Sequence, residues 1–174
     1  MSIPNSVTSI GYGAFEGCRS LASVAIPNSV TSIKSSTFYN CNGLTNVTIP
    51  DSVTIIGNEA FFGCESLTSI TIPNSVTNIG GSTFSGCSGL TNVTIPNSVT
   101  NIGSRAFENC SGLTILTISN NVNSIGEMAF YNCSSLTSLT FSGKDKATVQ
   151  GMENYSWVLP TGCKITCTDG TITI

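Results

Sequence analysis

A segment of 23 residues repeats six times without an insertion, and this feature constrains the fold more than any other. The units begin at Ile3, Ile26, Ile49, Ile72, Ile95 and Ile118. A period between about 20 and 50 residues indicates a solenoid, a propeller or another array, and one unit is too short for a propeller blade. Each unit is therefore predicted to be one coil of a solenoid, in which neighbouring coils bury each other's apolar side chains.

The spacing of apolar residues predicts one short strand in each coil. In the segment 67–73, Ile70 and Ile72 alternate with Ser69 and Thr71, which is the period of a strand with one buried face. Pro73 ends the strand because it has no N–H group to donate. Two further columns hold the same residue in all six units. They are Phe15, Phe38, Phe61, Phe84, Phe107 and Phe130, and Leu21, Leu44, Leu67, Leu90, Leu113 and Leu136.

After the strand, the apolar positions fall three to four residues apart, which favours turns and a short helical piece around the Ala-Phe pair. The column two residues after Phe contains only glycine and asparagine, the two residues that enter the left-handed region most readily. We expect the helical turn to end there. Stacked coils would then lie about 4.8 Å apart in a parallel sheet. The column is Gly17, Asn40, Gly63, Gly86, Asn109 and Asn132.

These columns carry a family resemblance. The pattern LxxIxIPxxVxxIgxxAFxxC, present as LTSITIPNSVTNIGGSTFSGC at residues 67–87, resembles the 23-residue leucine-rich repeats of BspA-like and treponemal surface proteins. The resemblance covers residues 3 to about 140. It implies a right-handed α/β repeat solenoid with short parallel strands, turns and helical pieces, its strands on a concave face. It also implies cell-surface or secreted localisation and a role in binding. The chain shows no signal peptide and begins part-way through a unit, with MSIPNS.

The two ends of the chain differ from the repeats. We assign residues 1–140 to the six repeats and residues 141–174 to a C-terminal cap, because solenoids need an atypical unit over the last coil. The cap is expected to end in a hairpin of Lys164–Cys167 and Thr171–Ile174 around the sequence TDG. Trp157 is expected to cover the open core, with ligand binding as its alternative role.

The first unit lacks the Leu-x-x-Val part of a preceding strand, so its coil presents an open edge formed by Ile3, Val7, Ile10 and Phe15. Unpaired edges recruit other chains. The chain is therefore either part of a longer array or expected to self-associate through this N-terminal edge.

Six of the eight cysteines occupy one repeat column. Equivalent Cα atoms on adjacent coils would lie about 5 Å apart, but their Cβ atoms would point in parallel, whereas a disulfide needs them to converge. Free buried thiols that act as small apolar fillers are predicted. Cys163 and Cys167 lie outside the repeats and would sit about 13 Å apart on one strand, too far to pair. The repeat cysteines are Cys18, Cys41, Cys64, Cys87, Cys110 and Cys133.

Composition argues against several classes of function. Only 9% of the residues are charged, the net charge is -3, and no basic stripe is present, so nucleic acid is a poor candidate partner. No apolar run approaches the roughly 20 residues of a membrane-spanning helix, so membrane insertion is not expected. The chain has no histidine, which removes the usual base of a serine or cysteine nucleophile. Without histidine or CxxC spacing, no metal site is predicted, and no cofactor is expected.

The outward positions of the strands are the candidate binding residues. They form a polar surface rich in hydroxyls and amides, which predicts a non-enzymatic module that recognises a protein or a glycan. The alternative is a structural spacer, because Ser and Thr also simply tolerate exposed strands. An ice-matching hydroxyl array is a third, weaker interpretation, since Ala25 and Ile115 interrupt it. The candidate residues are Ser23, Asn46, Thr48, Ser69, Thr71, Asn92, Thr94, Ile115, Thr117, Ser138 and Thr140.

A second variable column follows the repeated Phe. It places Tyr39 and Phe62 on adjacent coils, on the side opposite the strands. Adjacent exposed aromatic rings can form a sticky patch, but rings that lie against their own surface are more common. The second interpretation is the one we favour.

Overall fold

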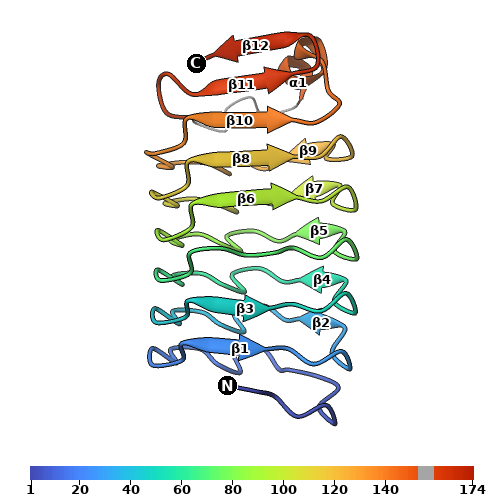
Figure 1. Cartoon of the computed structure of the whole chain (residues 1–174), viewed down its shortest axis with the longest axis vertical. Coiled ribbons are helices and arrows are strands. Elements are labelled where there is room, and N and C mark those ends of the chain that lie inside the picture. The colour runs from blue at the N-terminus through green and yellow to red at the C-terminus, as the bar shows by residue number, and fades with distance from the viewer. Residues whose placement is uncertain (153–158) are drawn as a thin grey trace.

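The chain is a column of stacked coils (Figure 1). The computed structural model describes residues 1–152 and 159–174. The expected role of Trp157 lies outside the described residues. Successive coils follow one another along the long axis of the column, which confirms the solenoid that the 23-residue period predicts.

A first sheet runs along one side of the column and is parallel except at its last strand. Its strands keep the repeat columns in register, since Val24 pairs with Val47 and Leu116 pairs with Leu139. The sheet is interrupted once, because Ser69 makes only an isolated bridge to Asn92. Its strands are β1 (Ser23–Ala25), β3 (Asn46–Thr48), β6 (Asn92–Ile95), β8 (Ile115–Ile118), β10 (Ser138–Phe141), β11 (Lys164–Cys167) and β12 (Gly170–Thr173).

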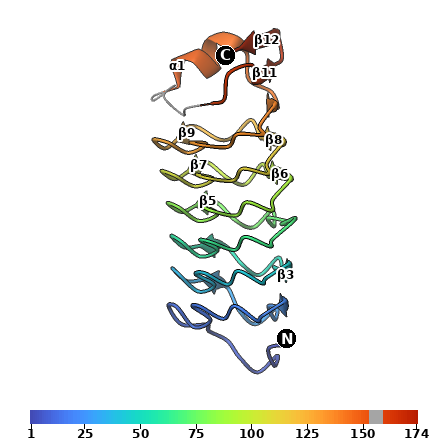
Figure 2. The same ribbon diagram turned by 90° about the vertical axis from the view of Figure 1, so that its left-hand side faces the viewer.

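A second parallel sheet, which the sequence analysis did not predict, runs along another side of the column (Figure 2). Its strands have two residues each, too few to show the alternation that marks a strand. Outside the interruption at Ser69, adjacent coils are therefore tied together by strand pairing on two sides of the column instead of one. These strands are β2 (Ser32–Ile33), β4 (Ile55–Ile56), β5 (Asn78–Ile79), β7 (Asn101–Ile102) and β9 (Ser124–Ile125).

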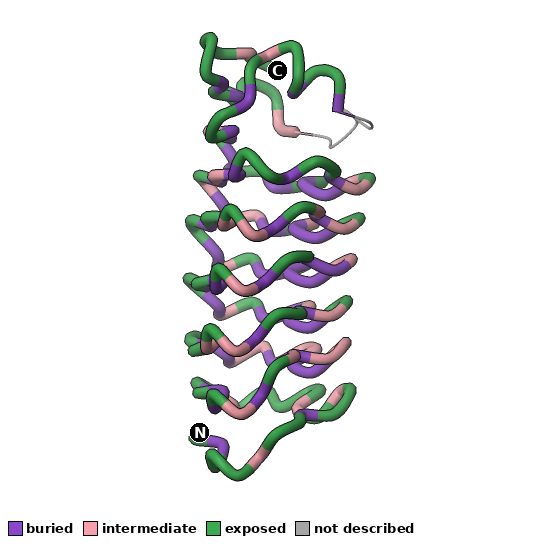
Figure 3. Tube along the Cα trace, turned by 90° about the vertical axis from the view of Figure 1, so that its right-hand side faces the viewer, coloured by how far each residue is buried: buried purple, intermediate pink, exposed green. Residues whose placement is uncertain are grey.

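The repeated Phe residues form a continuous stack through the interior. Successive ring centroids lie 5.3 to 6.1 Å apart and adjacent rings are nearly parallel. Phe38 to Phe130 are fully buried, whereas Phe15 of the first coil is only half-buried. The coils after the first show a similar succession of buried and exposed segments, whereas the first coil is mostly exposed (Figure 3). The predicted core columns are thus confirmed, and each coil packs mainly against its two neighbours.

Turns replace the helical pieces that the α/β expectation placed around the Ala-Phe pair. In the second coil the N–H groups of Thr37, Tyr39 and Cys41 each bond to the carbonyl three residues before. The N–H groups between them, those of Phe38 and Asn40, donate to carbonyls of the next coil. An α-helix would use all of these N–H groups within itself. The need to bond the next coil therefore excludes a helix, and the expectation of helical pieces in the repeats is wrong.

The turns require two left-handed residues in each coil. All six residues of the Gly/Asn column have positive φ, which confirms the conformation expected there, although it does not end a helix. A second left-handed column lies four residues earlier and was not anticipated, because its residue types vary. That column is Gly13, Ser36, Glu59, Ser82, Arg105 and Met128.

The segment after β10 contains the one α-helix of the described residues, α1 (Lys146–Gly151), which Asp145 caps by accepting a bond from the Thr148 N–H group. Strand β11 pairs in parallel with β10 and so continues the first sheet past the repeats. Strand β12 pairs with β11 in antiparallel fashion and closes the hairpin. The predicted hairpin is confirmed, with its second strand one residue earlier than expected.

Candidate binding face

The candidate residues project from the first sheet toward solvent, on a surface that we call the strand face. Pairing places Asn92, Ile115 and Ser138 in one row of neighbours across adjacent strands, and Thr94, Thr117 and Thr140 in another. Thr117, Ser138 and Thr140 are half-buried, and Ser23, Asn46, Thr48, Ser69, Thr71, Asn92, Thr94 and Ile115 are exposed.

The strand face is close to flat along the column. The coils stack almost straight in Figures 1 and 2, so the curvature implied by the resemblance is slight. Two features break the uniformity of the face. Ile115 is apolar and 46% exposed, and the segment around Ser69 and Thr71 pairs with its neighbour only through an isolated bridge.

A hollow of about 520 Å³ lies beside this interruption. It extends over three successive coils, because Thr71, Thr94 and Thr117 belong to one repeat column. Four predicted residues thus meet there, namely these three threonines and Asn92. The complete lining is Ile70, Thr71, Ile72, Asn74, Asn92, Thr94, Ile95, Pro96, Asn97, Thr117, Ser119 and Ser142.

Several lining residues were missed by the sequence reasoning, which considered only strand positions. Asn74 and Asn97 stand in the turn that follows each strand, where Val76 and Val99 donate their N–H groups back to proline carbonyls. The repeated tripeptide Pro-Asn-Ser is the signal that could have identified this column. Its asparagines lie beside the ends of the strands and extend the row of amides.

Five polar side chains of the hollow make no bond within the protein, whereas the Ser119 hydroxyl donates to the Pro96 carbonyl and the Asn92 amide donates to the Thr91 hydroxyl. Within the described part of the chain, the hydroxyls of Thr71, Thr94 and Thr117 and the amides of Asn74 and Asn97 make no hydrogen bond. Elsewhere on the surface, equivalent groups bond across coils. Examples are Asn101 to Asn78 at 2.8 Å and Asn132 to Asn109 at 2.9 Å. The hollow thus presents donors and acceptors that a ligand can use without breaking protein contacts.

The strand face also continues beyond the residues that were predicted. Because β11 pairs with β10, Lys164 aligns with Ser138 and Thr166 aligns with Thr140. The alternation in KITC, which matches SLTF of β10, is the signal that could have shown this. The extension adds one charged side chain to an otherwise neutral surface.

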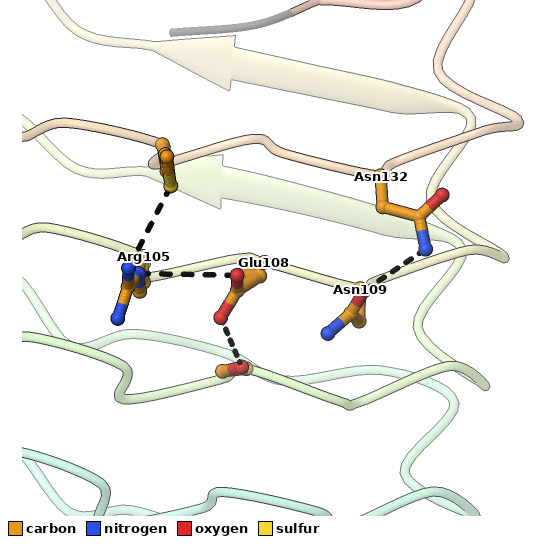
Figure 4. A network of polar contacts seen from close by, with 6 residues as sticks. Arg105, Glu108, Asn109 and Asn132 are labelled. Atoms are coloured by element: carbon orange, nitrogen blue, oxygen red, sulfur yellow. Dashed lines mark hydrogen bonds and ion pairs between the residues drawn. The ribbon is translucent and has the colours of Figure 1, made fainter.

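On the turn side of the column, polar side chains link adjacent coils (Figure 4). Glu108 contacts Arg105 at 3.9 Å and accepts a bond from the Ser85 hydroxyl at 3.4 Å. The Arg105 side chain is 56% exposed, so this ion pair contributes little to stability. Among the described residues, no group of three or more His, Cys, Asp or Glu side chains gathers in a metal-binding arrangement. The network serves to align coils.

The neighbouring rings of Tyr39 and Phe62 also lie on this side. Their centroids are 4.8 Å apart and their planes are nearly parallel. Both residues are half-buried, which agrees with the expectation that they lie against their own surface. They form an external pair beside the internal Phe stack.

The repeat thiols form a hydrogen-bonded column. Each of five thiols donates to the carbonyl of the Phe in the preceding coil, as Cys87 does to Phe61 at 3.1 Å, so they are donors as well as fillers. Burial raises the pKa of Cys41 from 9.0 to about 11 and that of Cys64 from 9.0 to about 12. Because the thiolate is the nucleophile, these groups are poorly suited to catalysis.

The expectation that all six repeat cysteines are buried is wrong for Cys18, which is exposed. It lies in the first coil, where the structure has no preceding coil to cover it. Cys163 and Cys167 are buried and free, as expected from their separation. No cysteine of the described residues forms a disulfide.

The repeat pattern and the coil geometry match one family in particular. The BspA type leucine rich repeat region aligns with the chain in six copies, over residues 1–87 and 54–157. The chain belongs to the BspA-type leucine-rich repeat family. The resemblance noted from the sequence is therefore confirmed. No curated protein matches the chain significantly.

Solved structures of bacterial leucine-rich repeat proteins share this fold. A leucine rich repeat protein of Treponema pallidum is 33% identical with a TM-score of 0.76, and the match covers 81% of this chain and 71% of that one. A leucine rich cell surface protein of Faecalibacterium prausnitzii is 34% identical with a TM-score of 0.72, over 75% of this chain and 34% of its own. The pneumococcal vaccine antigen PcpA shares the fold at 24% identity and a TM-score of 0.71, and the match covers 84% of this chain and 36% of PcpA.

The matched region is therefore about a third of the length of two of these three proteins. This BspA-type chain has no helix, within its described residues, that is long and apolar enough to cross a membrane.

Proposed function

We propose that this BspA-type chain is a non-enzymatic binding module that recognises a protein or a glycan through its strand face. The observation that carries the proposal is the set of free hydroxyl and amide groups in the hollow on that face. Surface groups without internal partners are available to a ligand, and a few placed polar groups in a concave site are what orient a ligand there.

A microbial cell surface is the proposed setting. The support is the Faecalibacterium prausnitzii protein, whose description as a cell surface protein accompanies 34% identity to this chain. Secretion or surface display would also place the strand face where it meets other proteins and glycans. The identity of the partner is part of the proposal only at the level of its class.

A non-enzymatic role is supported by the placement of reactive groups. Five repeat thiols are buried and bonded to Phe carbonyls, and the described carboxylates do not gather into a site. Turnover by the purified chain of any substrate offered to it would contradict this part of the proposal.

The rival function is a structural spacer that presents another domain. It is favoured by the strand pairing between coils and the Phe stack, which give a nearly straight column. On this view the polar strand face serves only to keep the column in solution. The two functions differ in whether substitutions on that face change any binding.

The test is a binding screen against immobilised extracellular-matrix proteins and a glycan array, with a triple variant Asn46→Ala, Asn92→Ala and Thr94→Ala. We expect at least tenfold weaker binding by this variant to any ligand that is found. A matched control replaces three exposed residues beside the second sheet, with Thr31→Ala, Thr77→Ala and Asn123→Ala, and should bind like the unmodified chain. Absence of any ligand, or equal effects of both variants, would favour the spacer.

A further inference from the structure

We infer that the hollow on the strand face binds a neutral, linear glycan of β-1,4-linked pyranoses, lying along the long axis of the column. The inference rests on the proposed function of the strand face and adds to it a site and a chemical class of ligand. It follows from three properties of the hollow, which are its charge, the spacing of its polar groups and its apolar floor.

The first property is the absence of charge. None of the lining residues carries an ionisable side chain, and the polar groups are amides and hydroxyls. Such a surface offers no ion pair to a charged peptide or to phosphate. It matches hydroxyl groups, which donate and accept in the same way as the Asn and Thr side chains do. Because the side chains of Thr94, Asn74 and Asn97 make no internal hydrogen bond, their pairing with a ligand costs no protein contact.

The second property is the spacing. The Thr and Asn columns recur once per coil, and adjacent strands of a sheet lie about 4.8 Å apart. This distance is close to the rise of one pyranose in an extended β-1,4-linked chain. An extended peptide advances about 3.3 Å per residue and presents side chains on one face about twice as far apart. Neither spacing matches the distance between coils, so its side chains would not meet the same column in successive coils. A polyproline II peptide, at about 3.1 Å per residue, also falls out of step.

The third property is the floor of the hollow. Ile72 and Ile95 are almost fully buried beneath the polar groups, and Pro96 adds a flat apolar surface beside them. A pyranose in a β-1,4-linked chain also separates its polar and apolar groups, with hydroxyls at its edges and C–H groups on its faces. The glycan would place its C–H groups over the half-buried ring of Pro96 and its hydroxyls toward the Thr and Asn columns.

Occupancy of three coils predicts a dependence on length. Each added sugar contacts the next coil until the hollow is filled, so affinity should rise from the disaccharide to the trisaccharide and then level off. Cellohexaose and chitohexaose are the probes, because they share the linkage and differ in the N-acetyl group. Maltohexaose, with α-1,4 linkages, is the control for chain shape and should bind at least tenfold more weakly.

The experiment is isothermal titration calorimetry of the whole chain with these oligosaccharides. The variant Thr94→Ala with Asn97→Ala should weaken binding at least tenfold. The matched control, Thr77→Ala with Asn123→Ala, changes the same residue types at exposed positions beside the second sheet, away from the strand face, and should leave affinity within twofold. Circular dichroism and thermal melting of both variants confirm that each remains folded.

The outcomes separate this inference from the proposed function. Binding of either β-1,4-linked hexaose that depends on Thr94 and Asn97 but not on Thr77 and Asn123 supports the inference. If neither hexaose binds while a protein ligand depends on Asn92 and Thr94, the proposed function stands and the inference is wrong. If a hexaose binds but both double variants lose affinity equally, the hollow is not the site.

Discussion

Replacing Phe84 by alanine should be among the most damaging single changes to the repeats. Phe84 is fully buried and lies between Phe61, at 5.6 Å, and Phe107, at 5.3 Å. Large-to-small substitution of a buried phenylalanine costs about 3–5 kcal/mol. A single domain is stable by only about 5–15 kcal/mol, so this loss is a large fraction of the total.

The first coil provides the matched control. Phe15 has one stacking partner, Phe38 at 5.3 Å, and it is only half-buried. Each aromatic pair contributes about 0.5–1.5 kcal/mol beyond its area, so Phe15→Ala loses one pair where Phe84→Ala loses two. With less area returned to water as well, Phe15→Ala should cost about 1–2 kcal/mol.

The assay is guanidinium denaturation followed by far-UV circular dichroism, with the midpoint and the slope compared for each variant. Because each coil contacts mainly its neighbours, Phe84→Ala should also broaden the transition by uncoupling the coils on its two sides. Equal losses of stability for Phe84→Ala and Phe15→Ala would refute the reasoning, since the ring stack would then not be what joins the coils.

Four further outcomes are expected. Thiol titration of the native protein should detect Cys18 rapidly and the seven buried cysteines only after denaturation; fast reaction of several thiols would contradict their burial. The unfolding free energy should be constant up to about pH 9 and then fall as the pH rises. The reason is that the Cys64 thiol loses its proton near pH 9.0 in the unfolded chain but has a pKa of about 12 in the folded state. A pH titration of the unfolding free energy checks this. Gly86→Val should lower the melting temperature more than Gly86→Asn. The φ angle of Gly86 is +75°, which a β-branched residue adopts poorly, and no neighbouring atom lies closer than 3.4 Å to an added Cβ, so backbone strain and not a clash sets the difference. Equal melting temperatures would argue against this. Self-association through the N-terminal edge stays a prediction, although Ser2 already pairs with Ala25 of β1, and a clean monomer by light scattering at high concentration would oppose it.

The features that repeat within one coil were predictable from the residue pattern alone. The Phe and Leu columns identified the core, the alternation of apolar and polar residues identified the strands of the first sheet, and the Gly/Asn column identified a left-handed turn. Each of these signals is local, because a strand period or a tolerance for positive φ is a property of a few neighbouring residues. The strand residues of the candidate face followed from the same alternation.

Only the tertiary structure decided how one coil bonds to the next. Alternate N–H groups of the turns are used between coils, which excluded the helical pieces and placed Arg105 and Met128 in the left-handed region. The thiol column acquired its Phe carbonyl acceptors in the same way. The hollow arises because the pairing lapses at Ser69, beside Asn74 and Asn97 of adjacent turns. None of these follows from a local pattern, since the partner of each group stands a whole repeat away, and its position depends on how the stacked backbones meet.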